Sequence, residues 1–524
     1  MSRWKVAKVG VMLAALALAG AGVGAQQTGG ILRIRAMDLQ NVDPMQLLGR
    51  NDDIHVASQV FDQLVILGKD DFQPKPELAV SWELVDDTTW IFHLRQGVTF
   101  QDGNEVFPEG EGREAVADDV VYSVNRAKEM AANLNLEGIA DVRALDRYTV
   151  EVKTVGPQPL LLDVHRLSSV MIVPREAVEV LGEGMTTRPV GSGPFEIVSF
   201  VPGQEAVLRR NEDYWLPVNL DELHVIVIPD PTAAIIALEA GEVDVVPYGP
   251  ADEGPRLLEE GFLVAKRGGS FRGIVFNVTK PPFDDWRVRN AISLALDVNA
   301  AWQAVIPAGF GERAYGQVPP WVPWGYDPEG LRALDRYDPQ AALDLLAEAG
   351  WEDHDGDGLV DKDGQALTVE IKTFPGAQVR VLTILVTQLK QLGIDAKILQ
   401  EAVPVWVDDL LSGNTTAFFD FSYAGSTGLY SLFHSSAIGA SNTHFYSDPA
   451  VDYLLDLASV TLDPDTRSRL WKTAQSIVIA DRVIIPLYFE WTTTYVSPRV
   501  HDWVSPWGGL QLTSVESNVW VESP

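Results

Sequence analysis

The chain has no cysteine among its 524 residues. Disulfide bonds, thiolate nucleophiles and cysteine-ligated zinc sites are therefore excluded. Basic residues are also scarce, because 40 lysines and arginines stand against 73 aspartates and glutamates, for a formal net charge of −33. Nucleic-acid binding needs clustered lysine and arginine, so nucleic acid is not an expected partner. Such acidity instead favours a protein that stays soluble and monomeric.

Common catalytic motifs are also missing. The sequence has no HExxH motif, no P-loop and no dinucleotide-binding glycine motif. The segment Ala424–Gly428 is similar to a nucleophile elbow around Ser426, but it begins with alanine where glycine is usual. The eight histidines are scattered and form no recognisable triad partner. We therefore expect no enzyme, and a secreted serine hydrolase built on Ser426 is kept as the competing hypothesis.

Long hydrophobic runs occur only at the N-terminus. Arg3, Lys5 and Lys8 precede an apolar run from Val9 to about Ala21, and small residues follow at 23–25. This order is typical of a secretory signal peptide, and it predicts cleavage after Ala25. No later apolar run is long enough to span a membrane. We expect a mature chain that is soluble and either periplasmic or secreted.

The remaining chain is long enough for two or three domains with a large core. The sequence predicts strands at 30–35, at 367–372, where apolar and polar residues alternate, and at 484–489, where the run is apolar and buried. It predicts helices at 54–67 and 379–392 and two more within 449–479. Strands and helices that alternate in this way indicate an α/β fold with mixed sheets flanked by helices.

Several blocks of sequence follow one another in a specific order. The first comprises Leu78–Trp82, Trp90–Gly103 and Ala117–Arg126. Later blocks are Gly191–Phe195, Glu242–Pro247 and Pro281–Ala295. Within them, Asp118 and Asp119, and then Asp284 and Asp285, precede apolar-periodic runs, where carboxylates suit a helix N-terminus. The pair Asp102-Gly103 predicts a turn directly after a strand.

These blocks closely resemble family 5 of the bacterial extracellular solute-binding proteins, which serve ABC importers of peptides, oligosaccharides or nickel. The resemblance extends from about residue 30 to residue 495. It implies a periplasmic-binding-protein fold of two lobes with a cleft between them, an extra subdomain in lobe 1, and no covalent chemistry. It also implies that the transmembrane permease subunits of an ABC importer are the partner. Because the chain has no cysteine, the lipid anchor of some relatives is excluded.

The resemblance also implies domain limits. Residues 1–25 are the signal peptide, and lobe 1 is expected to combine residues 26–57, 186–268 and 492–524. The extra subdomain is expected at 58–185 and lobe 2 at 269–491. The chain would then cross between the lobes near residues 269 and 491, and these hinges would let the lobes close over a solute.

The sequence specifies the ligand-binding residues less clearly than the fold. In peptide-binding members, a lobe 2 segment carries an aspartate that pairs with the α-ammonium of the peptide. The matching segment here is 421–430, where Tyr423, Gly425 and Ser426 are the candidate contacts, and it contains no carboxylate. A buried ammonium without a counter-ion costs several kcal/mol. The segment therefore favours a different means of holding the ligand, by neutral polar groups.

The opposing wall is expected at Gly49, Arg50 and Asn51. An arginine in a cleft favours a carboxylate, a phosphate or a stacked ring, whereas the alternative is an arginine on the solvated rim. The further candidate contacts are Tyr248, Phe271 and Trp406. The chain has 15 tryptophans, and aromatic faces commonly hold sugars. Five of these tryptophans are candidates because they lie in expected loops or turns, although packing is the commoner role: Trp321, Trp324, Trp406, Trp503 and Trp507.

Peptide is the default ligand class by family frequency, and oligosaccharide is the alternative. Nickel is disfavoured because no histidines cluster near the expected cleft. One segment outside the cleft suggests a structural ion. Asp353, Asp355, Asp357 and Asp361 fall at positions 1, 3, 5 and 9 of a calcium loop, but position 12 is glycine where a bidentate glutamate is needed. We expect no cofactor other than this possible calcium; the alternative is a polar turn.

Overall fold

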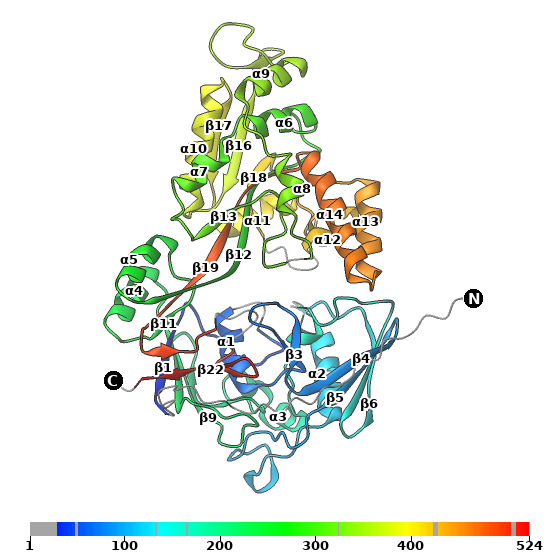
Figure 1. Ribbon diagram of the computed structural model, residues 1–524, viewed down its shortest axis with the longest axis vertical. Coiled ribbons are helices and arrows are strands. Elements are labelled where there is room, and N and C mark those ends of the chain that lie inside the picture. Colours follow the sequence, from blue (N-terminus) through cyan, green and yellow to red (C-terminus); the bar gives the residue numbers. More distant parts are fainter. Residues whose placement is uncertain are drawn as a thin grey trace, which may run out of the picture.

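The computed structural model describes residues 29–47, 51–131, 134–163, 166–322, 324–422, 428–504 and 510–522. Figure 1 shows two lobes, one above the other. The lower lobe, here lobe 1, contains the N-terminal half of the described chain and its last residues. The upper lobe, lobe 2, contains the segment between the two long strands that join the lobes. The predicted signal peptide, residues 1–25, lies outside the described residues.

One mixed sheet of eleven strands passes through both lobes and joins them. Its outer strands on one side belong to lobe 2, its central strands cross the junction, and its remaining strands belong to lobe 1. In order across the sheet they are β17 (Asp395–Gln400), β16 (Thr368–Thr373), β18 (Ala417–Ser422), β12 (Leu263–Phe276), β19 (Ile484–Val496), β11 (Val245–Val246), β1 (Ile31–Ala36), β10 (Glu222–Val227), β9 (Glu205–Arg210) and β8 (Phe195–Val201), with β13 (Gly311–Arg313) also paired to β19.

A second sheet, antiparallel throughout, lies inside lobe 1. Its order is β4 (Ala79–Asp86), β5 (Thr89–Leu94), β7 (Thr149–Thr154) and β6 (Ile139–Asp146). Four short two-stranded ribbons complete the strands of the described residues: β2 (Val65–Leu67) with β3 (Pro74–Pro76), β14 (Asp361–Lys362) with β15 (Gln365–Ala366), β20 (Val500–His501) with β23 (Trp520–Val521), and β21 (Thr513–Ser514) with β22 (Ser517–Asn518).

The first helix of lobe 1 is shorter than the sequence predicts. Helical spacing predicted a helix over 54–67, but α1 spans Asn51–Val60 and the chain then forms strand β2. All three residues of β2 are buried, and they pair with β3, so tertiary pairing overrides the local pattern. The other helices of lobe 1 and its flank are α2 (Ala117–Met130), α3 (Arg175–Leu181), α4 (Pro231–Glu239) and α5 (Gly254–Glu259).

Many helices of lobe 2 begin with the pair Asp-Pro. The aspartate side chain at the N-cap accepts a hydrogen bond from a backbone N–H of the first turn, and proline suits the first helical position. The predicted cap at Asp285 is confirmed, since its carboxylate accepts from Arg287 N. The helices are α6 (Trp286–Leu294), α7 (Val298–Gln303), α8 (Pro328–Arg332), α9 (Pro339–Glu348), α10 (Gln378–Gln391), α11 (Val403–Leu411), α12 (Gly428–Phe433), α13 (Pro449–Val460) and α14 (Pro464–Ala480).

Each lobe has its own hydrophobic core. In lobe 2 the sheet separates two clusters, one packed under α6, α7, α9 and α10 and the other under α8 and α11 to α14. The second cluster is rich in aromatic side chains and is called here the aromatic cluster; it includes Phe271, Trp321, Trp471 and Phe489. Lobe 1 has one large cluster that spans both of its sheets. Its two subdomains are therefore packed as one body.

Buried charged groups also join the two sheets of lobe 1. Arg126 of α2 donates to both carboxylate oxygens of Asp43 at 2.8 and 2.6 Å, and both side chains are nearly inaccessible to solvent. Elsewhere in lobe 1, Asp62 is fully buried and accepts from Tyr214 Oη at 3.1 Å. Burial and the neighbouring Asp62 raise the pKa of the Glu77 carboxyl well above its ordinary value. Asp62 and Glu77 thus share a low-dielectric junction.

Candidate functional site

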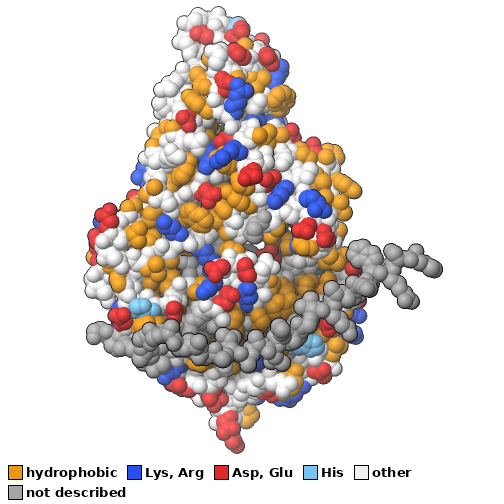
Figure 2. Space-filling model, viewed as in Figure 1, with side chains coloured by type: hydrophobic (Ala, Val, Ile, Leu, Met, Phe, Trp, Pro, Cys, Tyr) orange, Lys and Arg blue, Asp and Glu red, His pale blue; other side chains and the backbone are white. Residues whose placement is uncertain are grey.

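The two lobes meet along the paired strands β12 and β19. The pairing is antiparallel and runs from Leu263 opposite Val496 to Val275 opposite Ile484, with a register shift between Arg267 and Ser270. Both expected lobe crossings, near residues 269 and 491, lie on these strands. Figure 2 shows the surface hollowed where the lobes meet. A pair of strands with an irregularity at its middle is a suitable hinge.

Glycine is required at this irregularity because the strands approach closely. A Cβ atom at Gly269 would lie 1.5 Å from the Glu490 carbonyl oxygen. A Cβ atom at Gly268 would lie 2.7 Å from Trp321 Nε1. The two glycines therefore let β19 and an indole ring pack directly against the hinge backbone.

The lobe 2 side of the junction is aromatic. The Trp321 ring lies 5.0 Å from the Trp491 ring and 5.7 Å from the Phe489 ring, centroid to centroid. Beside them, Arg272 of β12 donates to Glu490 of β19 at 2.9 and 2.5 Å, so a cation and an anion of the hinge strands neutralise each other. Phe489 is fully buried and Trp321 is 9% exposed, so these two rings lie behind the wall of the junction, and Trp491 is the most accessible of the three.

The lobe 1 side places Tyr248 at the junction. Its backbone has φ of 55°, and the next residue, Gly249, donates to Thr493 of β19. The Tyr248 ring stacks on His55 of α1 at 6.2 Å, and its hydroxyl lies 3.4 Å from His55 Nε2. Burial lowers the pKa of His55 to about 4, so the imidazole is neutral at pH 7. Sequence reasoning named Tyr248 but missed His55, which carries no motif.

The structure places the predicted contact residues in three different settings. Tyr248 lies at the lobe junction, stacked on His55. Phe271 and Trp406 are 1% and 6% exposed and belong to the aromatic cluster, where Trp406 meets Phe374 edge to face. In this conformation they form the core behind the wall rather than the wall itself. Gly49, Arg50, Tyr423, Gly425 and Ser426 lie outside the described residues, and Asn51 begins α1 with a side chain that is not described.

The tryptophans proposed for sugar stacking have other contacts. Trp321 and Trp324 pack in or against the aromatic cluster, and Trp324 lies 5.5 Å from Trp471. Trp503 packs against the lobe 1 core. Trp507 lies outside the described residues. Packing therefore accounts for the described members of this set.

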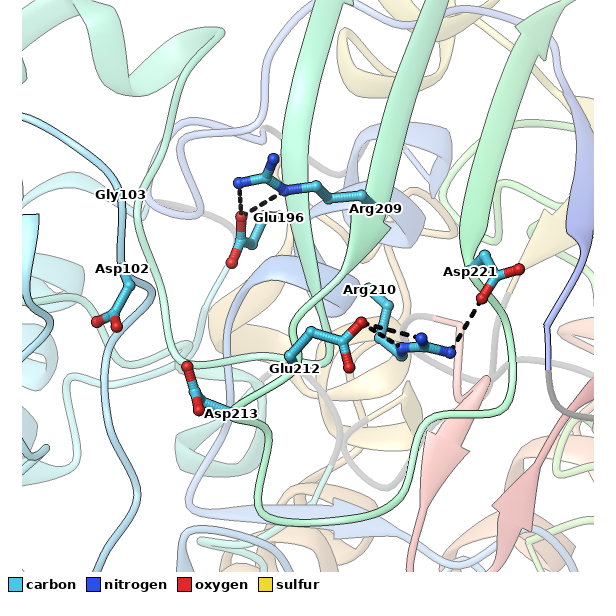
Figure 3. Close-up of a pocket in the computed structure, with 8 residues that line it drawn as sticks. All are labelled: Asp102, Gly103, Glu196, Arg209, Arg210, Glu212, Asp213 and Asp221. Atoms are coloured by element: carbon cyan, nitrogen blue, oxygen red, sulfur yellow. Dashed lines mark hydrogen bonds and ion pairs between the residues drawn. The ribbon is translucent and has the colours of Figure 1, made fainter.

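Two further cavities lie on lobe 1. One, of about 560 Å³, is lined by Lys69, Trp503, Glu516 and Asn518 among others. Figure 3 shows the other, of about 430 Å³, whose lining residues are Asp102, Gly103, Glu196, Arg209, Arg210, Glu212, Asp213 and Asp221. Both of its arginines are paired, Arg209 with Glu196 and Arg210 with Glu212 and Asp221. Its charges are largely satisfied within the protein.

The predicted calcium loop is partly assembled. Carboxylate oxygens of Asp353, Asp355 and Asp361 lie within 4.8 Å of one another, and these are oxygen donors of the kind that calcium prefers. The fourth predicted ligand, Asp357, is not part of this group, and its carboxylate accepts from Leu359 N. Asp353 also accepts from Gly356 N and Gly358 N, as in an ordinary polar turn. Calcium binding stays a prediction.

Comparison with known proteins identifies the family. Residues 73–439 match the bacterial extracellular solute-binding proteins, family 5 (Middle). The chain is 29% identical over 488 residues to heme-binding protein A of Haemophilus influenzae, covering 86% of each chain. It is 28% identical to di/tripeptide-binding protein 3 of Pseudomonas aeruginosa, over 88% of this chain and 90% of that one.

A solved structure has the same fold. The periplasmic binding protein DppA of Helicobacter pylori, in complex with the peptide STSA, superposes with a TM-score of 0.73 at 24% identity, covering 95% of this chain and 99% of that one. The fold and the site define a two-lobed solute-binding protein, the extracellular component of an ABC importer. The chain belongs to family 5 of the bacterial extracellular solute-binding proteins. Within the described residues, no helix is long and apolar enough to cross a membrane.

Proposed function

We propose that this protein captures a short peptide between its lobes and delivers it to the permease of an ABC importer. The hinge carries this proposal: β12 and β19 join the two lobes, and glycines occupy the point where the strands shift register. Relatives named for di- and tripeptides match over nearly their whole length. Lobe closure is then driven by the difference in peptide affinity between the closed and open states.

The manner of peptide binding is expected to differ from an ammonium clamp. The segment 421–430 contains no aspartate or glutamate. A hydrogen bond to a charged group contributes about 1.5–3 kcal/mol, so a peptide held through its ammonium would lose more than about tenfold in affinity when that group is acetylated. Without a carboxylate in the segment, we expect recognition of the peptide backbone and side chains instead.

The first test is native mass spectrometry of the secreted, purified chain. A lobe-enclosed ligand is released slowly, so a peptide is expected to co-purify and to appear as a ladder of adduct masses. The peptide identified in this way is then titrated by calorimetry in its free and N-acetylated forms. Equal affinities within about tenfold support recognition without an ammonium clamp. Adducts spaced by hexose units would overturn the peptide proposal.

The same preparation tests two finer points of the proposal. We propose that the chain is exported by residues 1–25 and stays free of the membrane, so intact mass is expected to show cleavage after Ala25 and no lipid. We also propose that it has no catalytic step. A panel of esterase and peptidase substrates is expected to give no turnover, and turnover that disappears in Ser426→Ala would contradict this.

A further inference from the structure

A turn of lobe 1 reaches across the junction to lobe 2. It connects β2 to β3 and is closed by bonds from Gly68 N to the Gln73 carbonyl and from Phe72 N to the Gly68 carbonyl, at 2.8 and 3.2 Å. Phe72 has a φ of 54°, a conformation that a bulky residue adopts only when its surroundings hold it there. Its ring packs against the aromatic cluster of lobe 2. The turn therefore presents one aromatic side chain to the opposite lobe.

Contacts with a second turn of lobe 1 also hold this turn in place. Lys69 N donates to Glu516 Oε2 at 2.8 Å, and Lys75 pairs with Asp71 and Glu516 at 2.7 and 3.7 Å. Glu516 lies in the tight turn between β21 and β22 of lobe 1. Two turns of the same lobe thus brace each other and fix the position of Phe72.

The partner of Phe72 is a cation on the hinge itself. The guanidinium of Arg267 lies 5.1 Å from the centroid of the Phe72 ring, and Arg267 is the last paired residue before the register shift in β12. Burial lowers the pKa of Arg267 to about 10, and the negative charges of Asp70 and Glu516 in lobe 1 partly offset this effect. Desolvation strengthens a cation–π contact, and Arg267 is buried.

A second pair of charges faces across the same junction. Burial lowers the pKa of Arg467 on α14 of lobe 2, and the negative charge of Asp163 in lobe 1 partly offsets this effect. The guanidinium itself donates to the Thr461 and Leu462 carbonyls of its own lobe. Opening of the lobes at the hinge would separate Phe72 from the aromatic cluster and Asp163 from Arg467. These contacts belong to the arrangement with the lobes together, and they need no solute.

We propose that Phe72, which contacts the aromatic cluster of lobe 2 and is positioned by Arg267 at the lobe 1 end of the hinge, forms a latch that stabilises the closed arrangement of the lobes and thereby sets the affinity for the captured solute. A contact made by the protein alone raises the population of the binding-competent state before the solute arrives. The consequence for peptide affinity rests on the proposed function, whereas the effect on the lobe equilibrium does not.

The test measures the lobe separation directly. The chain has no cysteine, so Val155→Cys in lobe 1 and Tyr453→Cys in lobe 2 give two unique attachment points, at side chains that are 76% and 65% exposed. The protein is unfolded in guanidinium, freed of any co-purified molecule and refolded. Spin-label distances are then compared between the parent, Phe72→Ala and Arg267→Met, with no peptide added.

The latch predicts that Phe72→Ala lowers the ratio of closed to open molecules by about tenfold, because the aromatic contact with lobe 2 is lost. Arg267→Met is expected to shift the ratio in the same direction by a smaller factor, because it removes the group that positions the Phe72 ring. Because the two side chains act on each other, the double variant is expected to shift no further than Phe72→Ala alone. Tyr337→Ala is the matched control: it removes an exposed aromatic ring of lobe 2 and is expected to leave the distances unchanged.

Unchanged distances in both Phe72→Ala and Arg267→Met overturn the proposal, as does an equal shift in Tyr337→Ala. If Phe72→Ala does not refold, Phe72→Leu serves the same comparison, since it keeps the apolar bulk and loses the ring. The peptide identified by mass spectrometry gives a second readout, with a dissociation constant about tenfold larger for Phe72→Ala. If the protein binds no peptide, only the proposed function is contradicted. The spin-label distances still test the latch in that case.

Discussion

Two junctions of this molecule are held by different chemistry. Inside lobe 1, the two sheets are joined through a common core and a buried ion pair, Asp43 with Arg126. Between the lobes, two strands cross and the additional contact is that of the Phe72 ring of lobe 1 with the aromatic cluster of lobe 2. Removing one partner of a buried ion pair costs several kcal/mol, whereas an aromatic pair contributes about 0.5–1.5 kcal/mol.

The difference corresponds to what each junction must do. A junction that stays closed tolerates groups that are very costly to separate. A ligand shifts the equilibrium between open and closed lobes only by the difference in its affinity for the two states. The contacts at a junction that opens in each cycle of capture and release must therefore have a free energy of similar size to that difference. Substitutions at each junction, in order of expected effect, test whether lobe 1 is rigid and the lobe junction adjustable for these reasons.

Arg126→Met is expected to destabilise the protein by about 3–5 kcal/mol, because it leaves the Asp43 carboxylate buried without its partner. Urea unfolding measures the change. Arg143→Met is the control, since Arg143 pairs with Glu151 while more than half exposed, and a loss below about 1 kcal/mol is expected there. Equal losses for the two variants would show that the buried pair does not hold the junction.

Gly269→Ala is expected to cost about 1–3 kcal/mol, because the added methyl group would overlap the Glu490 carbonyl and push the hinge strands apart. Thermal unfolding measures the cost, and the spin-label distances should broaden at the same time. Gly156→Ala offers a control in lobe 1, where an added Cβ has no atom within 4 Å. A fully stable Gly269→Ala with unchanged distances would exclude close strand packing at the hinge.

Asp62→Asn tests the second charged group of the rigid junction. Burial raises the pKa of Asp62 to about 6 from an ordinary 3.8, so the folded state binds this proton more tightly than the unfolded state. Its contribution to stability therefore grows as pH falls from 7.5 to 5 and disappears as pH rises through 6, a change of roughly 1 kcal/mol.

Urea unfolding at pH 7.5 and pH 5 measures this contribution in the parent and in Asp62→Asn. The asparagine can still accept from the Tyr214 hydroxyl but cannot titrate, so part of the pH dependence should vanish. Identical pH dependence in the two proteins would place the shifted titration elsewhere in lobe 1.

Calcium is expected to have the smallest effect. Asp353 and Asp355 are exposed, so an ion held with Asp361 should raise the unfolding temperature by a degree or two at millimolar calcium, and leave the lobe distances unchanged. Differential scanning calorimetry with calcium, magnesium or EDTA checks this. Asp353→Asn is expected to abolish the increase, and an equal increase in that variant would locate the ion at another position.

The sequence predicted those features that depend on short-range order. Asp285 caps a helix as expected, and the strands at 31–36 and 368–373 lie within a residue or two of their predicted limits. These features follow from capping chemistry and from the two-residue period of a strand, which neighbours along the chain determine. The error at residues 61–67 has the opposite origin, because β2 exists only through its pairing with β3.

Prediction of individual site residues was weaker. Phe271 and Trp406 were chosen as contacts, but an apolar side chain on a central strand or helix faces either the core or the cleft, and the sequence alone cannot distinguish them. His55 was missed because a lone histidine in a helix has no recognisable spacing. Phe72 was missed for the same reason, since its partner Arg267 lies nearly 200 residues further along the chain.

The sequence by itself determined the α/β class, the helix starts, the family and the acidic, cysteine-free character of this protein. These properties depend on composition, on local periodicity and on motifs that are contiguous in the chain. Only the tertiary structure decided which sides of β12 and β19 meet at the hinge, which aromatic rings are core, and which turn of lobe 1 reaches lobe 2. Those contacts join residues far apart in sequence, and their free energy arises only when packing removes both partners from water.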